Sequence, residues 1–318
     1  MSAATVGTTV GVRHVVSAQQ FDRPRLEALF AAAREMERVL AAGGDDRLRG
    51  RLLATLFYEP STRTRLSFES AMLRLGGQVV STENARDFSS AIKGESLEDS
   101  VRIVAGYADA IVLRHPEEGA AARAAAVAPV PILNAGDGPG EHPTQSLLDL
   151  YTIERELGRV DGLRVVMVGD LAHGRTVHSL AQLLAGFEGV RLTLAAPAAV
   201  RMRTDVLARL RAQGADIVET DDLLAALRDA DVVYQTRLQR ERFGADEAAG
   251  AAAARIAERF RITPDVMASL GAHAIVLHPL PRVGEIDPAV DADPRAAYFR
   301  QAHNGVAVRM ALLAELLA

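Results

Sequence analysis

The chain lacks several residue types, and each absence narrows what it can do. It has 318 residues and no cysteine, and only one of its 36 Lys and Arg residues is a lysine, Lys93. Without cysteine there can be no disulfide, zinc–thiolate centre, iron–sulfur cluster or cysteine nucleophile. No apolar run approaches the roughly 20 residues that span a bilayer, and the start of the chain does not have the pattern of a signal peptide. We therefore expect a cytoplasmic protein without a membrane partner.

Composition and charge favour a globular protein that acts on small molecules. The chain is 49% hydrophobic and 24% charged, and its formal net charge is −5. This length can form one large or two medium domains with sizeable cores. The negative balance argues against nucleic acid as the main partner, although local basic clusters can still bind small anions.

Short apolar runs alternate with helical stretches along the whole chain. Strands of unbroken apolar character that are separated by helices are typical of parallel sheets covered on both faces. We expect two α/β domains, each a mostly parallel sheet flanked by helices, divided close to Pro143 into residues 1–143 and 144–304. The final apolar helix, 305–318, could pack on either domain. Seven runs are predicted strands: 52–57, 110–114, 130–135, 163–170, 190–197, 230–236 and 273–281.

The helix after the first predicted strand is well marked. Phe68, Ala71, Met72 and Leu75 follow the spacing of one helical face, and a Gly-Gly pair ends the pattern. Chemically suggestive clusters follow this strand and five others, namely EPSTRTR, RHP, GEHPTQ, AHGRT, TRLQ and HPLPR. Ligands of open α/β sheets bind at the carboxyl ends of strands, so we expect one active-site cleft between the two domains.

The run from Ser61 to Arg65, STRTR, predicts an anion site. A helix that opens here would present backbone N–H groups, hydroxyls and a guanidinium to one point, which suits phosphate. The alternative is an ordinary helix cap with solvated arginines. The site is not a P-loop, because Ile92 and not glycine precedes Lys93, and GDLAHG is not a dinucleotide-binding fingerprint.

Histidines and arginines complete the candidate chemistry. His142 and His278 each precede proline, which favours an extended backbone, and none of the eight histidines has convincing metal-ligand spacing. We interpret His142 as a hydrogen-bonding residue and His278 as structural, with the polar feature there being the carbonyl before Pro281. Arg175 and Arg237 follow strands of the second half and together would suit a dicarboxylate, although each taken singly could be a surface residue.

Taken together, these motifs resemble the carbamoyltransferases, and within them the catalytic chains that act on aspartate. STRTR and HPTQ are common to the carbamoyltransferases, whereas RTVHSL, TRLQ and HPLPR point to aspartate. The resemblance runs from near residue 13 to the final helix and is weakest over the alanine-rich residues 245–257. Gly284 also departs from the family pattern, which has an acidic residue there. The implied reaction transfers the carbamoyl group of carbamoyl phosphate to L-aspartate, in pyrimidine biosynthesis, without metal or cofactor.

The resemblance also implies a role for individual residues. Carbamoyl phosphate would be held by Ser61, Thr62, Arg63, Thr64, Arg114, His142, Gln145, Ser89 and Lys93. The carbamoyl carbonyl would be polarised by Thr64, Arg114 and His142, with Lys93 also catalytic. Aspartate would be bound by Lys93, Arg175, Arg237, Gln239, the Leu280 carbonyl and a cis bond to Pro281. Domain closure would depend on Glu59 and Arg242, with Glu59 positioning Arg175 and Arg242 in the closed state. The first domain would bind carbamoyl phosphate and carry the packed helix 305–318, and the second would bind aspartate.

The lone lysine has a place in this scheme. Ser89 and Lys93 match a family loop that reaches the active site of a neighbouring subunit, which implies a homotrimer with shared sites. A compact ammonium can fit between a phosphate and a carboxylate, where a wide guanidinium would displace one of them. The family also joins regulatory chains or dihydroorotase in larger complexes.

Three other interpretations stay open at this point. Ornithine carbamoyltransferases share STRTR and HPTQ, but they carry cysteine where this chain has Pro279 and an acidic S-M-G motif that this chain lacks. Lys93 could form a Schiff base, although its polar surroundings would not depress its pKa. The chain could also be a non-catalytic scaffold, which would have no need for so complete a set of site residues.

Overall fold

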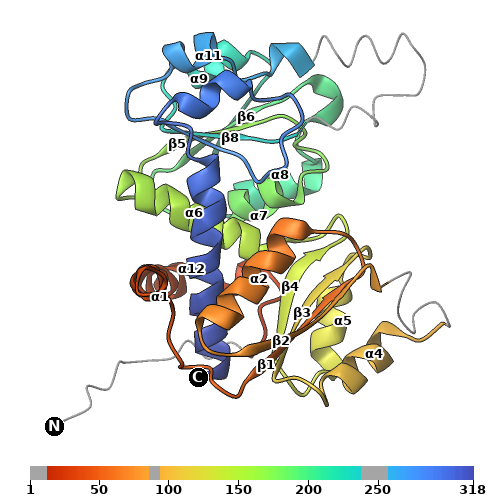
Figure 1. Cartoon of the computed structure of the whole chain (residues 1–318). Coiled ribbons are helices and arrows are strands. Elements are labelled where there is room, and N and C mark those ends of the chain that lie inside the picture. The colour runs from red at the N-terminus through yellow and green to blue at the C-terminus, as the bar shows by residue number, and fades with distance from the viewer. Residues whose placement is uncertain (1–12, 86–93, 238–256) are drawn as a thin grey trace. The chain divides into compact units, whose positions relative to one another are not determined.

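A computed structural model describes residues 13–85, 94–237 and 257–318, which form two compact units (Figure 1). The first unit runs to Thr144 and includes Val306–Ala318, and the second is Gln145–Gly305. Each unit is a parallel sheet flanked by helices, which confirms the predicted fold class. No helix in the described ranges is long and apolar enough to cross a membrane.

The first unit is built on a four-stranded parallel sheet with the order β2-β1-β3-β4. Its strands are β1 (Leu52–Phe57), β2 (Gln78–Glu83), β3 (Ala110–His115) and β4 (Ile132–Asp137). Its helical elements are η1 (Ala18–Gln20), α1 (Arg23–Ala41), α2 (Thr62–Arg74), α4 (Leu97–Val104) and α5 (Ala120–Val127).

Both faces of this first sheet are covered. Ala54 and Leu56 of β1 share a buried cluster with Val101 of α4 and Ala124 of α5. Successive residues of a strand point to opposite faces of the sheet. The β1 residues on either side of Ala54 and Leu56 therefore face the opposite layer of helices, which contains α2. The α2 face is the predicted one, because Phe68, Ala71, Met72 and Leu75 are all fully buried.

Glycine is required where α2 ends. Gly76 has φ +77°, and a Cβ there would lie 2.8 Å from the Cα of Asp46. Only a residue without a side chain fits that combination of backbone and space. The turn sends the chain directly into β2, beside β1 in the sheet. The C-terminal part of α12 (Tyr298–Leu317) packs in the same unit, where the Arg309 guanidinium lies 5.0 Å from the Phe68 ring centroid.

The second unit is built on a five-stranded parallel sheet with the order β7-β6-β5-β8-β9. Its strands are β5 (Arg164–Val168), β6 (Arg191–Ala195), β7 (Asp216–Thr220), β8 (Val232–Gln235) and β9 (Ile275–Leu277). Its helical elements are α6 (Pro143–Leu157), α7 (Arg175–Leu184), η3 (Ala198–Val200), α8 (Thr204–Ala212), α9 (Leu223–Leu227), α11 (Pro264–Ser269), η5 (Pro288–Ala292) and the start of α12.

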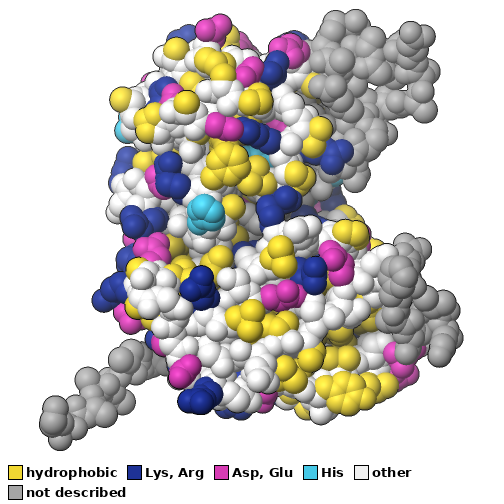
Figure 2. Space-filling model, viewed as in Figure 1, with side chains coloured by type: hydrophobic (Ala, Val, Ile, Leu, Met, Phe, Trp, Pro, Cys, Tyr) yellow, Lys and Arg dark blue, Asp and Glu magenta, His cyan; other side chains and the backbone are white. Residues whose placement is uncertain are grey.

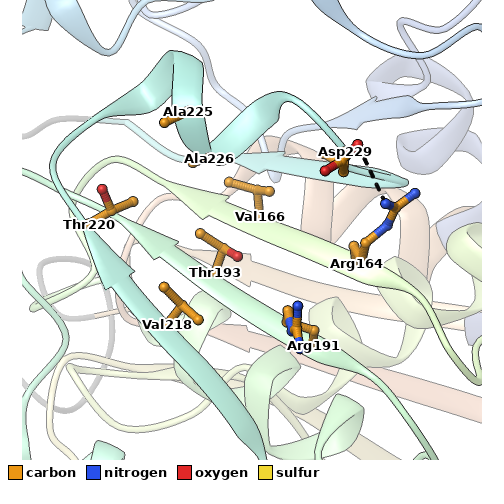
Figure 3. A pocket seen from close by; sticks show the side chains of 10 residues that line it. Arg164, Val166, Arg191, Thr193, Val218, Thr220, Ala225, Ala226 and Asp229 are labelled. Carbon is orange, nitrogen blue, oxygen red and sulfur yellow. Dashed lines mark ion pairs between the residues drawn. The ribbon is translucent and has the colours of Figure 1, made fainter.

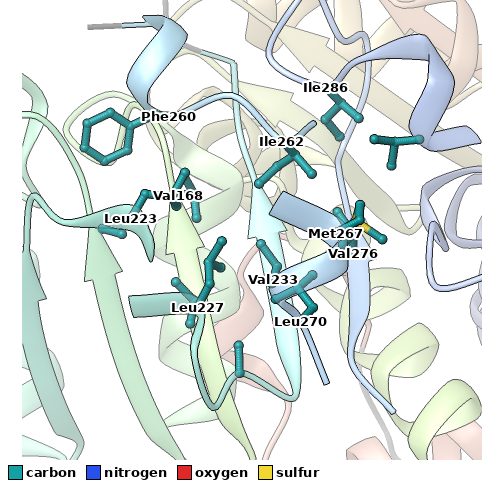
Figure 4. Close-up of a cluster of buried hydrophobic side chains, with 14 of the residues drawn as sticks. Val168, Leu223, Leu227, Val233, Phe260, Ile262, Met267, Leu270, Val276 and Ile286 are labelled. Carbon is teal, nitrogen blue, oxygen red and sulfur yellow. The ribbon is translucent and has the colours of Figure 1, made fainter. Parts of the chain in front are cut away.

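The core of the second unit lies against one face of its sheet (Figure 4). Val168, Val233 and Val276 come from the three neighbouring strands β5, β8 and β9 and are fully buried. They pack with side chains from α9, from α11 and from the segment that contains Phe260 and Ile262. This core holds the central strands in place, so the residues that follow their carboxyl ends have fixed starting points.

Candidate active site

The start of α2 differs from an ordinary helix cap. Ser61 is the N-cap residue, but its side chain accepts no hydrogen bond from the helix. In α4, by contrast, the Ser96 hydroxyl accepts the Asp99 N–H at 3.1 Å, as an N-cap serine usually does. Ser61 therefore holds the N-cap position without the side-chain hydrogen bond of an ordinary cap. The first-turn N–H groups of α2 and the Ser61 hydroxyl lie at the positive end of the helix, where such groups can bind an anion.

The two arginines of STRTR have different environments. Arg65 is tied within the unit, because its guanidinium donates to Glu83 at 2.9 Å and to Ser81 at 3.1 Å. Arg63 is exposed, and within the described part of the chain no carboxylate pairs with it. The protein around Arg63 still removes enough water to lower the pKa of its guanidinium. Arg63 is thus the arginine of the motif that can meet an anion, and Thr64 beside it is buried.

A second group of predicted residues meets at the carboxyl ends of β1, β3 and β4. Arg114, in β3, donates to the Ala135 carbonyl at 3.1 Å, and its side chain is only 14% exposed. Glu59 follows β1 and lies 3.5 Å from the Arg114 guanidinium. Because β1 and β3 are neighbours, the start of α2 and Arg114 share one edge of the sheet. His142 follows the β4 loop, immediately before α6, and is 5% exposed.

In the second unit, Arg175 and Arg237 follow two adjacent strands. Arg175 is the first residue of α7 after β5, and Arg237 comes two residues after β8. The strand ends are in close contact, since Thr236 N–H donates to the Val168 carbonyl at 2.8 Å. Gly169 makes this approach possible, because a Cβ there would lie 2.5 Å from the Thr236 carbonyl oxygen. The two predicted carboxylate-binding arginines therefore start from the same edge of the same sheet.

The third strand end of this unit carries the predicted backbone site. The Leu280–Pro281 peptide bond is cis, as the resemblance implied. His278 is buried and structural, as predicted: its Nδ1 accepts the Leu280 N–H at 2.8 Å and its Nε2 donates to Glu285 at 2.7 Å. Burial alone would raise the pKa of Glu285, but the hydrogen bonds that it accepts from His278 Nε2 and the Val283 N–H lower it. The hydrogen bonds of the buried His278 side chain therefore hold the loop that bears Leu280.

Sequence reasoning missed a buried polar cluster behind these residues. Asp149 of α6 is fully buried and accepts hydrogen bonds from Gln145, Gln301 and Tyr234. Of the four, only Gln145 was a candidate. The available signal was an aspartate among apolar residues of a predicted helix, four residues after Gln145. A buried aspartate demands donors, but the sequence does not show which residues supply them.

Several predicted positions lie outside the described residues. These are Ser89, Lys93, Gln239, Arg242 and residues 245–256 of the alanine-rich stretch. Gly284 is described and has φ +91°, in the left-handed region that favours glycine. Over the described ranges, no group of three or more His, Asp or Glu side chains could hold a metal ion.

A hollow of about 270 Å³ in the second unit lies elsewhere (Figure 3). It rests on the face of β5, β6 and β7 beneath the five-residue helix α9, which is too short to cover that face. Arg164 and Arg191, at the amino ends of their strands, form one side, and Arg164 pairs with Asp229 at 3.7 Å. None of the predicted site residues lines this hollow.

Comparison with known proteins gives one consistent result. Residues 13–155 match the carbamoyl-P binding domain of the aspartate/ornithine carbamoyltransferases, and residues 161–316 match their Asp/Orn binding domain. Aspartate carbamoyltransferase 1, chloroplastic, of Pisum sativum is 55% identical over 98% of this chain and 81% of its own. The catalytic subunit of M. jannaschii aspartate transcarbamoylase superposes with a TM-score of 0.90 at 46% identity, covering 96% of this chain and 98% of that one.

A further solved structure is informative about ligands. Aspartate transcarbamoylase from Trypanosoma cruzi, in complex with carbamoyl phosphate and aspartate, has a TM-score of 0.88 and 45% identity, covering 96% of this chain and 97% of that one. Both halves of the sequence thus match one family in order, and the relatives named here match over 81–98% of their own length. The chain belongs to the aspartate/ornithine carbamoyltransferase family.

Proposed function

We propose that the chain is the catalytic chain of an aspartate carbamoyltransferase. It transfers the carbamoyl group of carbamoyl phosphate to the amino group of L-aspartate and releases N-carbamoyl-L-aspartate and phosphate. The observation that carries the proposal is the start of α2, where Ser61 does not cap its helix and Arg63 has no carboxylate partner in the described ranges. The T. cruzi relative, which binds both carbamoyl phosphate and aspartate, supports the choice of substrates.

The first unit supplies the carbamoyl phosphate site. Ser61, Thr62, Arg63 and Thr64, at a helix N-terminus, hold the phosphate through hydroxyls, N–H groups and a guanidinium. Arg114 and His142 complete the set near the carbonyl oxygen, from the neighbouring strand end and the β4 loop. Because phosphate is the leaving group, the same cations stabilise the charge that it takes away.

The second unit supplies the amino-acid site. Arg175 and Arg237 provide two guanidinium groups on adjacent strand ends, which matches the two carboxylates of aspartate. Ornithine has one carboxylate and a cationic side chain, which two guanidinium groups would repel. The Leu280 carbonyl accepts a hydrogen bond from the amino group and so directs its lone pair. Gln239 and Lys93 assist aspartate binding.

The chemistry depends on donors that are in place before reaction. An uncharged amine attacks the carbamoyl carbon, and negative charge builds on the carbonyl oxygen. The bond from that carbon to the phosphate oxygen then breaks, and the proton lost by the amine leaves with the phosphate. Thr64, Arg114, His142 and Lys93 stabilise that oxygen, and loss of one such donor typically costs roughly 100- to 1000-fold in rate. Holding two mutually repelling anions together supplies much of the remaining acceleration. The reaction requires the two half-sites to face each other, with Glu59 and Arg242 acting on closure.

The test is to incubate purified chain with carbamoyl phosphate and either aspartate or ornithine, and to measure the carbamoylated amino acid. We expect product with aspartate alone. Product with ornithine alone would mean that the assignment of Arg175 and Arg237 is wrong. A chain that forms neither product, but still binds phosphate, would favour a scaffold.

We also propose that the chain works as a homotrimer in which Ser89 and Lys93 complete a neighbour's site. Support comes from exposed apolar residues on the first unit, where Leu66 and Leu73 of α2 and Val80 of β2 are 50%, 60% and 46% exposed. Apolar side chains gather on the corresponding face in Figure 2. Ser89 and Lys93 follow the edge strand β2 in the sequence by six and ten residues, so an interface that includes β2 is compatible with their reaching the neighbour.

Two matched substitutions test the assembly. Val80 and Val218 are both about half exposed on edge strands, β2 of the first unit and β7 of the second. Val80→Asp is expected to dissociate the trimer in analytical ultracentrifugation, and Val218→Asp is expected to leave it intact. Mixing Lys93→Ala chains with Arg63→Ala chains should restore some activity through hybrid sites. Mixed trimers that stay inactive would contradict a shared site.

The cellular setting stays a prediction. We propose a cytoplasmic enzyme of pyrimidine biosynthesis, although the Pisum sativum relative is named chloroplastic. The M. jannaschii protein is named a catalytic subunit, and a separate regulatory chain or a dihydroorotase is the partner that we propose to seek by co-purification.

A further inference from the structure

Asp149 is a buried carboxylate at the centre of a hydrogen-bond network in the second unit. It is fully buried on α6 and accepts three short hydrogen bonds. Gln145 Nε2 and Gln301 Nε2 donate to its Oδ1 at 2.7 and 2.6 Å, and the Tyr234 hydroxyl donates to its Oδ2 at 2.6 Å. An ionised carboxylate is costly to bury unless it is satisfied in this way. The donors come from three elements, α6, α12 and β8, so Asp149 joins them.

One branch of the network reaches the loop that bears Leu280. A carboxylate only accepts, so the amide nitrogens of Gln145 and Gln301 must face Asp149 and their carbonyl oxygens must point away. Gln301 Oε1 accepts the backbone N–H of His278 at 2.8 Å. The ring Nδ1 of His278 in turn accepts the backbone N–H of Leu280 at 2.8 Å. The orientation of one amide is thereby transmitted to the backbone beside the Leu280 carbonyl.

A second branch reaches the start of α7. Burial and the charge of Asp149 raise the pKa of Tyr234 well above its ordinary value, so the phenol keeps its proton and donates to Asp149. The Thr176 side chain lies beside the Tyr234 hydroxyl and acts against this shift. Thr176 directly follows Arg175, the first residue of α7, so the phenol held by Asp149 lies against the helix turn from which Arg175 extends.

We propose that Asp149 is a positioning residue that orients three substrate-binding groups at once: the Gln145 amide, the Arg175 guanidinium and the Leu280 carbonyl. This inference rests on the proposed function and extends it. One buried acceptor links a residue of the carbamoyl phosphate site to two groups of the aspartate site. Such support matters because a displacement of about 1 Å in a binding group can cost roughly 100-fold in rate.

The experiment compares Asp149→Asn with Asp231→Asn. Asp231 is also buried in the second unit, and its carboxylate also accepts hydrogen bonds, from the Arg164 backbone N–H, the Arg164 guanidinium and His273. It lies at the amino end of β8, far along the strands from the candidate residues. Tyr234→Phe removes a single hydroxyl from the Asp149 network, and it decides the question if Asp149→Asn does not fold. Each variant is assayed for kcat, KM for aspartate, phosphate affinity and urea unfolding.

Asparagine keeps one oxygen for the two glutamines and turns its NH₂ toward Tyr234, which can then no longer donate to it. Asp149→Asn and Tyr234→Phe are therefore expected to lower kcat/KM for aspartate by roughly 10- to 100-fold, while phosphate affinity changes by less than about twofold. Asp231→Asn is expected to lower stability and to leave KM for aspartate within about twofold.

Two results would separate a failure of the proposed function from a failure of the positioning role. If the wild-type chain forms no N-carbamoyl-L-aspartate, the proposed function fails. If the wild type is active but Asp149→Asn and Tyr234→Phe match Asp231→Asn in KM for aspartate, the network is only structural and the positioning role is overturned.

Discussion

Ser61→Ala should separate substrate binding from helix stability. An N-cap serine usually contributes about 0.5–2 kcal/mol to stability through its hydrogen bond to the first turn. The Ser61 side chain makes no such bond, so its removal should change the free energy of unfolding by well under 1 kcal/mol. A hydrogen bond from this hydroxyl to phosphate would contribute about 1.5–3 kcal/mol, equivalent to roughly 10- to 150-fold in the dissociation constant.

Ser96→Ala is the matched control, because the same change at the start of α4 removes a real cap. It should lower stability by about 0.5–2 kcal/mol and leave phosphate affinity unchanged. Urea unfolding followed by far-UV circular dichroism suits a chain without tryptophan, and calorimetric titration gives the dissociation constant of inorganic phosphate. If Ser61→Ala destabilises the chain as much as Ser96→Ala and still binds phosphate normally, Ser61 is a cap and the reasoning fails.

Three further substitutions test other parts of the molecule. Lys93→Arg should reduce turnover by roughly 100-fold with unchanged circular dichroism, and near-normal turnover would make the lone lysine an accident of composition. Burial lowers the pKa of His178, so the unfolded state takes up its proton first and stability should fall as the pH drops from about 7.5 to 5.5. His178→Gln should reduce that slope in urea unfolding, and an equal slope would contradict the assignment. Gly169→Ala should cost about 1–3 kcal/mol, because φ is +115° and the Thr236 carbonyl is too close, and should raise KM for aspartate; unchanged stability would refute this.

Seven strands could be predicted from sequence, and two could not. Each of the seven predicted runs overlaps a strand, because these strands are largely buried and read as apolar runs. β2 and β7 were missed. Their sequences, QVVSTE and DIVET, carry polar residues, and every one of their positions is exposed or half exposed. Both lie at the edge of a sheet, but so do β4 and β9, which are buried and were predicted, so it is exposure that removes the apolar signal.

The candidate site also has a part that could be predicted from sequence and a part that could not. Residues at strand ends could be predicted, because topology alone places Arg114 beside the start of α2, and Arg175 beside Arg237. The partners of those residues could not. Nothing in the sequence indicates that Asp149 meets Gln301, since 152 residues separate them and only the folded second unit brings them together.

Pairing, and not the number of arginines, explains how an acidic chain binds two anions. With a net charge of −5, the chain as a whole would repel carbamoyl phosphate and aspartate. Most arginines cannot offset this, because carboxylates already neutralise many of them, as Glu83 does for Arg65 and Asp293 for Arg295. Arg63 and Arg65 are two residues apart, so their side chains leave α2 on nearly opposite sides. Of the two, only Arg65 meets carboxylates in the described ranges. Local attraction at the start of α2 therefore depends on which arginines the fold leaves to the substrate. An acidic residue introduced beside Arg63, as in Thr62→Glu, should weaken phosphate binding more than Thr62→Ala, which removes the same hydroxyl without adding charge, and equal effects in calorimetric titration would refute a role for local charge.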